Sequence, residues 1–199
     1  MKKTIFFKLF FLVLISGNAQ VKDTSEWNLI RIKIQDEDFF IKHDSTNVEH
    51  YFKRALFKGQ LGKYNEVIED YTKIIELNPT YAEAYNNRGL AKRKLNKNKE
   101  AIIDFNKAIE LKPDYITAYL SRGNSKSDLE LYKEAIDDYN KAIALDSQYG
   151  DAFSNRGKAK LKQGNYNEAI VDLKTAIAIN PNNKIYQENL NNALKKTSK

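Results

Sequence analysis

A short motif that returns at a fixed interval constrains the fold of this chain more than any other feature of its sequence. The segments 84–89, 118–123 and 152–157 read AYNNRG, AYLSRG and AFSNRG, and each begins 34 residues after the one before it. Aligning 82–115 with 116–149 gives 17 identical residues in 34 positions. Self-similarity at one period of this length is typical of repeat proteins, in which each unit buries its apolar face against its neighbours.

Each unit is predicted to fold as two helices. In the unit 82–115, Tyr85 and Gly89 lie about one helical turn apart, and a polar turn that reads NKNK follows them. Ala101 and Phe105 then begin an apolar face with helical spacing, and a proline ends the unit. Small residues let two antiparallel helices approach closely, and aromatic rings fill the space between pairs. The positions that we assign to this structural role are Tyr85, Gly89, Ala101, Phe105, Ala108, Tyr119, Gly123, Ala135, Tyr139, Ala142, Phe153, Gly157, Ala169 and Ala176.

The order and spacing of these residues, from aromatic to Gly, Ala, aromatic, Ala and Pro, resemble the tetratricopeptide repeat family. The resemblance implies an all-α fold, a right-handed superhelical solenoid of stacked antiparallel helix pairs. It also implies that the groove lined by the first helices binds peptides or partner proteins. The units that it covers are 48–81, 82–115, 116–149 and 150–183, and a capping helix is expected at 184–199.

The usual Trp of the family is Tyr or Phe in this chain, and two further departures lie on either side of the Gly of the first helix. Arg88 stands where the family has Leu before the Gly, and Lys92 stands where it has Tyr three residues after the Gly. An Asp recurs with the same period in the second helix, as at Asp104. We therefore expect each Arg to pair with an Asp of its own or the next unit and to hold the units in register. The alternative is a basic ladder that grips an acidic peptide. The two ladders are Arg88, Arg122 and Arg156, and Asp70, Asp104, Asp138 and Asp172.

Recognition is expected on the side of each first helix that lies opposite its packing face. The residues there differ between units while the structural positions stay constant. Such variation favours a binding groove, and neutral drift of a surface is the alternative. We expect the position of Asn86 to contact a partner above all, because it varies most. The predicted groove residues are Glu83, Asn86, Leu90, Arg93, Thr117, Leu120, Asn124, Ser127, Asp151, Ser154, Lys158 and Leu161.

One subclass of the family is similar in architecture but clamps the acidic tails of heat-shock chaperones. Its members use a Lys and an Asn one helical turn apart on a first helix. The corresponding pairs here are Phe52 with Leu56 and Asn86 with Leu90. The sequence therefore lacks this motif.

The N-terminal segment 1–19 has the layout of a secretory signal peptide. Two lysines open it, an apolar stretch at 9–15 follows, and Gly17 and Ala19 offer a small-residue cleavage site. The apolar stretch is far shorter than the roughly 20 residues that a spanning helix needs. We therefore expect export to the periplasm or the medium, with no transmembrane segment after cleavage. The alternatives are a buried N-terminal helix and an uncleaved anchor.

Residues 20–47 are predicted to be an N-terminal extension or linker with no assigned role. Within them the sequence NLIRIKI alternates apolar and basic residues, a period typical of a β-strand. One short strand without a partner is not stable alone. We therefore expect the segment to be loosely attached to the repeats.

Catalytic signatures are missing from the sequence. It contains no Cys, no glycine-rich nucleotide-binding pattern and no nucleophile elbow. Its two histidines, His43 and His50, lack metal-ligand spacing, so we predict no metal site, no cofactor and no small-molecule substrate. The formal charge of +7 falls to +4 without 1–19, and the chain has no long run of basic residues of the kind that binds nucleic acid.

These observations favour a non-catalytic module over an enzyme. The first hypothesis is an exported scaffold or adaptor that binds a protein or peptide in its concave groove and supports complex assembly. A sequence pI of about 9.3 motivates an alternative, a module that binds nucleic acid or another anionic polymer. A third possibility is an accessory domain for an enzyme that acts in trans.

Overall fold

The computed structural model describes residues 24–197, and within that range every regular element is an α-helix. The predicted signal segment 1–19 lies outside the described residues. The helices are α1 (Thr24–His43), α2 (Val48–Gln60), α3 (Tyr64–Leu77), α4 (Ala82–Lys94), α5 (Asn98–Leu111), α6 (Ile116–Asp128), α7 (Tyr132–Leu145), α8 (Gly150–Lys162), α9 (Tyr166–Ile179) and α10 (Lys184–Thr197).

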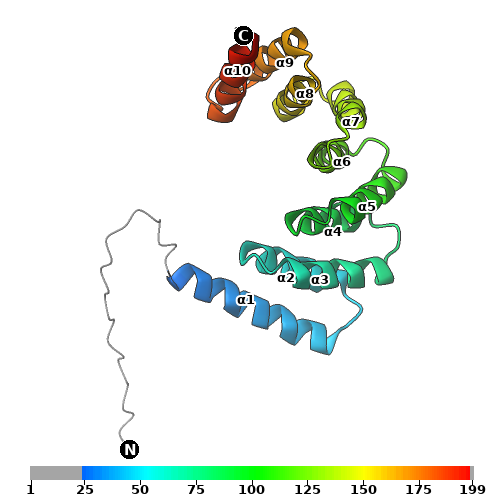
Figure 1. The fold of residues 1–199 in the computed structure, drawn as a ribbon. Helices are drawn as coiled ribbons and strands as arrows, with labels where there is room; N and C mark the ends of the chain where they lie inside the picture. The colour runs from blue at the N-terminus through cyan, green and yellow to red at the C-terminus, as the bar shows by residue number, and fades with distance from the viewer. Residues whose placement is uncertain (1–23, 198–199) are drawn as a thin grey trace, which may run out of the picture.

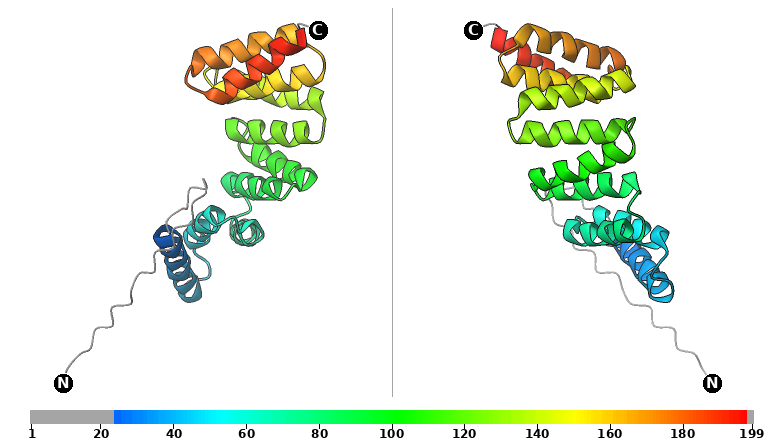
Figure 2. Two further views of the ribbon diagram at one scale, coloured as in Figure 1. Left: turned by 60° about the vertical axis from the view of Figure 1, so that its left-hand side comes forward. Right: turned by 90° about the vertical axis from the view of Figure 1, so that its right-hand side faces the viewer.

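Consecutive helices pack against each other along the whole array. Figure 1 shows them as an arc, with α1 and α10 at opposite ends, and Figure 2 shows the same helices as stacked layers. The pairs α2–α3, α4–α5, α6–α7 and α8–α9 correspond to the four repeat units, and we call α2, α4, α6 and α8 the first helices. The predicted all-α fold of stacked antiparallel helix pairs is confirmed.

Close helix contacts depend on a glycine of the first helix in three of the four pairs, and Ala55 takes its place in the pair α2–α3. A Cβ added to Gly89 would lie 2.7 Å from Phe105 Cε1, and one added to Gly123 would lie 2.6 Å from Tyr139 Cε1. These distances are shorter than carbon atoms tolerate, so only Gly fits. The buried alanines of the second helices, such as Ala101, continue the same interface. Gly89, Gly123 and Ala101 therefore lie where the two helices of a pair meet.

The turn inside each pair has the same backbone in every unit. Lys63 N donates to Lys58 O at 3.0 Å and Gly62 N donates to Gly59 O at 3.0 Å, which is the Schellman pattern that ends a helix. The residue at the centre of this turn has positive φ. In the four units it is Gly62, Asn96, Glu130 and Gly164, with φ of 72°, 59°, 61° and 83°.

The segment before the first unit is a helix rather than a strand or a loose linker. The prediction for 20–47 is wrong here because the alternating residues also satisfy a helical spacing. Ile30, Ile34 and Ile41 are partly buried on one side of α1, whereas Ile32 points outward and is 53% exposed. Ile41 packs against the apolar cluster of the first unit, so α1 belongs to the array.

The position of α1 in the repeat corresponds to that of a second helix, and α1 is the first helix among the described residues 24–197. Subtracting one period from α3 places the equivalent segment at 30–43, inside α1. Asp44 accepts hydrogen bonds from Thr46 N and Thr46 Oγ1, just as Asn78 accepts them from Thr80 N and Thr80 Oγ1 one period later. By the same register α10 corresponds to a first helix, and it packs on α9 and α8 through buried Tyr186.

Candidate functional site

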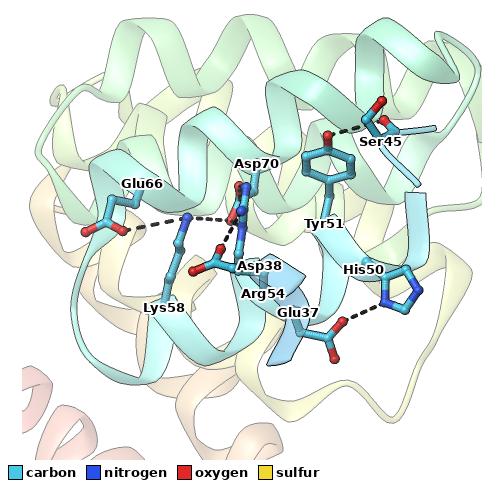
Figure 3. A network of polar contacts seen from close by, with 9 residues as sticks. All are labelled: Glu37, Asp38, Ser45, His50, Tyr51, Arg54, Lys58, Glu66 and Asp70. Atoms are coloured by element: carbon cyan, nitrogen blue, oxygen red, sulfur yellow. Dashed lines mark hydrogen bonds and ion pairs between the residues drawn. The ribbon is translucent and has the colours of Figure 1, made fainter. Parts of the chain in front are cut away.

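A buried carboxylate pairs with two cations in each unit. In the first unit, shown in Figure 3, Asp70 contacts the guanidinium of Arg54 and accepts from Lys58 Nζ at 3.0 Å. In the second unit, Arg88 Nε and Nη2 donate to Asp104 at 3.0 and 2.7 Å, and Lys92 Nζ lies 2.8 Å from the same carboxylate. The equivalents are Arg122 and Lys126 on Asp138, and Arg156 and Lys160 on Asp172.

These clusters explain both departures from the family pattern. The aspartates are only 2–4% exposed, and an unpaired carboxylate at such depth would be costly. The Arg and Lys that replace the usual Leu and Tyr neutralise it together. The predicted pairing of each Arg with an Asp of its own unit is confirmed, and the favoured structural interpretation explains the ladder better than a free basic surface does.

The same arginines also bond the unit that precedes them. Nη1 of Arg88 donates to Thr72 at 3.1 Å, and Nη1 of Arg122 donates to Asn106 at 2.7 Å. Arg156 repeats the bond with Asn140, and Arg54 repeats it with Asp38 of α1. Each guanidinium also lies over an aromatic ring of its own helix, for example 5.6 Å from the centroid of Tyr85. One side chain thus ties two second helices to one first helix.

The face formed by the first helices carries a row of recesses. Each lies between two successive first helices or between α8 and α10. The first, of about 210 Å³, is lined by Ala55, Leu56, Gly59, Tyr64, Val67, Tyr71, Asn87, Leu90, Ala91 and Lys94. The second, of about 120 Å³, is lined by Arg93, Asn124, Ser127, Asp128, Tyr139, Asn155 and Lys158. The third, of about 400 Å³, is lined by Lys158, Leu161, Lys162, Tyr166, Asn189, Asn192 and Lys196.

The three recesses are the same place in different units. Leu56, Leu90 and Lys158 all occupy one register position, and Tyr64 of the first recess corresponds to Tyr166 of the third. We call them the apolar, the polar and the cationic recess, in chain order. The first helices and α10 supply their sides, and side chains of a second helix close each one.

Several predicted groove residues line these recesses, and others bond the next unit. Leu90, Arg93, Asn124, Ser127, Lys158 and Leu161 are lining residues. Glu83 pairs with Lys112 at 3.4 Å, and Asp151 accepts from Tyr186 OH at 2.7 Å. Thr117 is exposed, and Leu120 packs against the apolar cluster around Tyr139.

Two predicted groove residues are not available at the surface. Asn86 is 3% exposed and Ser154 is 2% exposed. Asn86 Nδ2 donates to Asn87 Oδ1 at 3.2 Å, and Ser154 Oγ accepts from Asn189 Nδ2 at 3.1 Å. The prediction that the position of Asn86 is the main contact for a partner is therefore wrong for this conformation. Helical periodicity gives the direction of a side chain but not what the curved stack places over it.

The sequence reasoning missed an amide that recurs in the recesses. Asn87, Asn155 and Asn189 stand at one register position, one residue after the position of Asn86. Asn155 Nδ2 donates to Asn124 Oδ1 at 2.9 Å, and Asn189 bonds Ser154. The signal was present as an Asn that occupies this position in three of five copies, the fifth being α10. Lys162 and Lys196 of the cationic recess were missed as well, because their position is one residue beyond that of Arg93 and Leu161, the last position considered.

Tyrosine hydroxyls at the floor of the recesses stay protonated. Burial raises the pKa of Tyr71 to about 12, against an ordinary value near 10. Burial also raises the pKa of Tyr139, whose hydroxyl donates to Asn124 Oδ1 at 2.9 Å. These groups therefore position amides by hydrogen bonding, and they carry no charge at neutral pH.

Other kinds of site find little support in the part of the chain that the structure describes. Between residues 24 and 197 no group of three His, Asp or Glu side chains is placed to hold a metal ion. Over the same range no helix is long and apolar enough to cross a membrane. The recesses on the face of the first helices differ in polarity from one end of the array to the other.

Comparisons with known proteins identify the family. A family model for the tetratricopeptide repeat matches 82–115 and 150–183, and a second, described as TPR repeat, matches 59–93 and 128–164. Together the matches cover more than half of the 199 residues. The chain belongs to the tetratricopeptide repeat (TPR) family. The family resemblance found in the sequence is thereby confirmed.

Solved TPR structures share the fold. A crystal structure of MamA has a TM-score of 0.72 and 27% identity, over 83% of this chain and 96% of that one. The second TPR domain of human RPAP3, solved in complex with the HSP70 peptide SGPTIEEVD, has a TM-score of 0.55 and 29% identity, over 56% of this chain and 93% of that one. YrrB, described as a TPR protein with an unusual peptide-binding site, matches with a TM-score of 0.69 at 21% identity, over 82% and 84% of the two chains. Its likeness shows the fold alone. A search of curated protein sequences found no match.

Proposed function

We propose that this TPR protein is an exported scaffold that binds a protein or peptide in the groove of its first helices and supports the assembly of a larger complex. The observation that carries the proposal is the row of recesses along one face of the array. Leu56 and Leu90 are 47% and 37% exposed there, although both are apolar. Apolar side chains exposed side by side on an ordered surface favour a partner that covers them.

The solved neighbours support a peptide as the kind of ligand. The RPAP3 domain was solved with a peptide bound, and TPR proteins are in general interaction modules without catalysis. The buried carboxylates of the present chain pair with arginines and lysines and support the repeats.

Export of the protein follows from the predicted signal segment. We expect the mature chain to begin at Gln20. Expression of the full-length chain in a bacterial host and N-terminal sequencing of the exported fraction would test this. A protein that stays in the cytoplasm with 1–19 intact would contradict the export, and would leave groove binding untouched.

Binding by the groove is tested by partner capture with matched variants. The variant Leu56→Asp/Leu90→Asp places charge in the apolar recess. Its control, Ile103→Asp/Val171→Asp, changes two apolar residues of second helices that are 67% and 63% exposed outside the recesses. We expect the groove variant to reduce recovery of the partner at least about tenfold and the control to leave it unchanged. Equal recovery with both variants would contradict a groove-binding scaffold.

A further inference from the structure

The three recesses repeat one geometry with three chemistries. The register position that contributes most to their character changes from Leu to Asn and Lys along the chain. Its members are Leu56, Leu90, Asn124, Lys158 and Asn192. Because the backbone around it is the same in every unit, the difference between recesses lies in these side chains. The groove therefore offers a ligand different chemistry at its two ends.

The apolar recess lies at the end of the array next to α1. Leu56 and Leu90 stand at its rim, and Val67 and Ala91 lie deeper. No carboxylate is among its lining residues, and Lys94 is its one cation. Such a recess accepts an aliphatic or aromatic side chain and gains from removing the leucines from water.

The cationic recess lies at the opposite end, between α8 and α10. Lys158, Lys162 and Lys196 line it, all three are exposed, and no carboxylate lines it. Its two amides, Asn189 and Asn192, can donate hydrogen bonds as well.

Other cations of the array are paired with carboxylates, which sets this recess apart. Arg93 is bonded to Asp128 at 3.0 Å, and Lys112 is paired with Glu83. Lys160, two residues from Lys158, is held by Asp172 at 3.0 Å. Three lysines around one recess repel one another unless an anion lies between them. The cationic recess thus has a net positive charge that is complementary to carboxylates.

We infer that the groove binds a peptide segment that has an apolar part at the α2–α4 end and acidic side chains at the α8–α10 end. The inference rests on the proposed function and specifies its ligand. Lys158 stands in the last unit at the position that corresponds to the Asn of the chaperone-tail pair, whereas Lys162 and Lys196 lie outside that pair. None of the three lysines stands at the position of the Lys of that motif. The order of the two parts along the array is fixed by the order of the recesses.

The test uses three synthetic peptides and the whole chain. One peptide joins a leucine-containing half to a glutamate-rich half, the second replaces the glutamates by glutamines, and the third replaces the leucines by serines. All have amidated C-termini, so that side-chain carboxylates are the only anions. We expect the two-part peptide to bind most tightly, and each replacement to weaken binding at least about tenfold. Higher salt should weaken the two-part peptide and leave the glutamine peptide unchanged.

Matched charge variants locate the acidic half. Lys158→Glu/Lys162→Glu/Lys196→Glu reverses the cationic recess, and Lys99→Glu/Lys141→Glu/Lys174→Glu reverses three exposed lysines of second helices. Only the first set should lower affinity for the two-part peptide, by at least about tenfold, while binding of the glutamine peptide persists. Circular dichroism checks that both variants remain folded.

Three outcomes would overturn the inference. One is equal affinity of both triple variants for the two-part peptide. Another is photo-crosslinking of the acidic half to α2 or α4. The third is tighter binding of a single-stranded oligonucleotide than of any peptide at the lysines. If partner capture still depends on Leu56 and Leu90 in these cases, the scaffold function stands and only the acidic part of the ligand is wrong.

Discussion

In the turn that joins the two helices of a pair, the central residue is less favourable for stability in one copy of the repeat than in the others. Gly62 and Gly164 adopt positive φ without penalty, whereas Glu130 adopts φ of 61° with a full side chain. A left-handed conformation costs most residues about 1–2 kcal/mol, and Asn, as at position 96, less. The Schellman geometry of the turn imposes the conformation all the same.

Replacing Glu130 by Gly should therefore stabilise the protein. We expect Glu130→Gly to raise the free energy of unfolding by about 1 kcal/mol, because the strain is relieved while the turn is kept. Chemical denaturation monitored by circular dichroism measures the change. Gly164→Ala is the matched reverse variant, since no atom lies within 4 Å of its added Cβ, and it should lose a similar amount. A loss of stability on Glu130→Gly would show that its side chain makes a contact of greater value than the strain.

Two adjacent aspartates allow the buried clusters to be tested. Asp138 is 2% exposed and pairs with Arg122 and Lys126, whereas Asp137 is exposed. We expect Asp138→Ala to cost about 3–5 kcal/mol, because it leaves two cations without a partner in a partly buried place. Asp137→Ala should change the unfolding free energy by less than about 0.5 kcal/mol. Similar losses in both variants would mean that the cluster contributes little.

At the scale of the element, α1 has the structure that the sequence predicted least well. Its equivalents of Val67 and Tyr71, one period earlier, are Lys33 and Glu37, so the small and the aromatic residues that mark a second helix are missing. What replaces them is specific to this end of the array. His50 Nδ1 lies 2.7 Å from Glu37 Oε2, and the ring of Phe40 stacks on His50 at 4.9 Å (Figure 3 shows the ion pair).

A matched pair of isoleucines tests whether α1 is docked. Ile41 packs against the first unit, and Ile32 is exposed on the other side of the same helix. Ile41→Asp should destabilise the protein by at least about 2 kcal/mol, because it buries a charge without a partner. Ile32→Asp should cost less than about 0.5 kcal/mol. Hydrogen exchange of α1 amides should accelerate in the first variant alone. If neither variant changed the unfolding free energy or the exchange of α1, the result would support the loosely attached segment that the sequence predicted.

The sequence was sufficient to predict those parts of the structure that depend on local spacing. The helix pairs, the glycine contacts and the Arg–Asp pairs all follow from the period, because partners 16 residues apart recur together. It was insufficient to predict features that depend on how successive units stack, such as which side chains are buried and whether an end helix joins the array. Asn86 and Ser154 are covered, and α1 joins the array although it keeps few of the repeat positions. Ile34 and Asp36 match Ile68 and Asp70 one period later, and the turn DSTN at 44–47 is similar to DSQY at 146–149. The comparison of these two turns could have revealed the helix.

At the scale of the whole molecule, contacts join neighbours in the chain and few elements beyond them. Most helix contacts are between consecutive helices, with weaker ones between α4 and α6, α6 and α8, and α8 and α10. Stability in such an array is close to a sum over units and their interfaces. The arginines that bond two units supply a polar part of that coupling.

Hydrogen exchange should therefore vary along the array. We expect amides of α4 to α7 to exchange at least about tenfold more slowly than those of α1 and α10, because end helices lack one neighbour among the described residues. Mass spectrometry of peptic fragments measures the profile. Uniform exchange across all the described helices would indicate one cooperative unit instead of a graded array.

The fixed sequence interval of the Arg bonds has a consequence for the length of the groove. Each Arg bonds partners 16 residues before and after it, so excision of any 34 residues leaves both separations intact at the new joint. Removing 82–115 would bring the two ends of the groove closer by one repeat while each end keeps its own chemistry. The number of units therefore sets the distance between the apolar and the cationic recess, and with it how far apart the apolar and the acidic part of a ligand must lie.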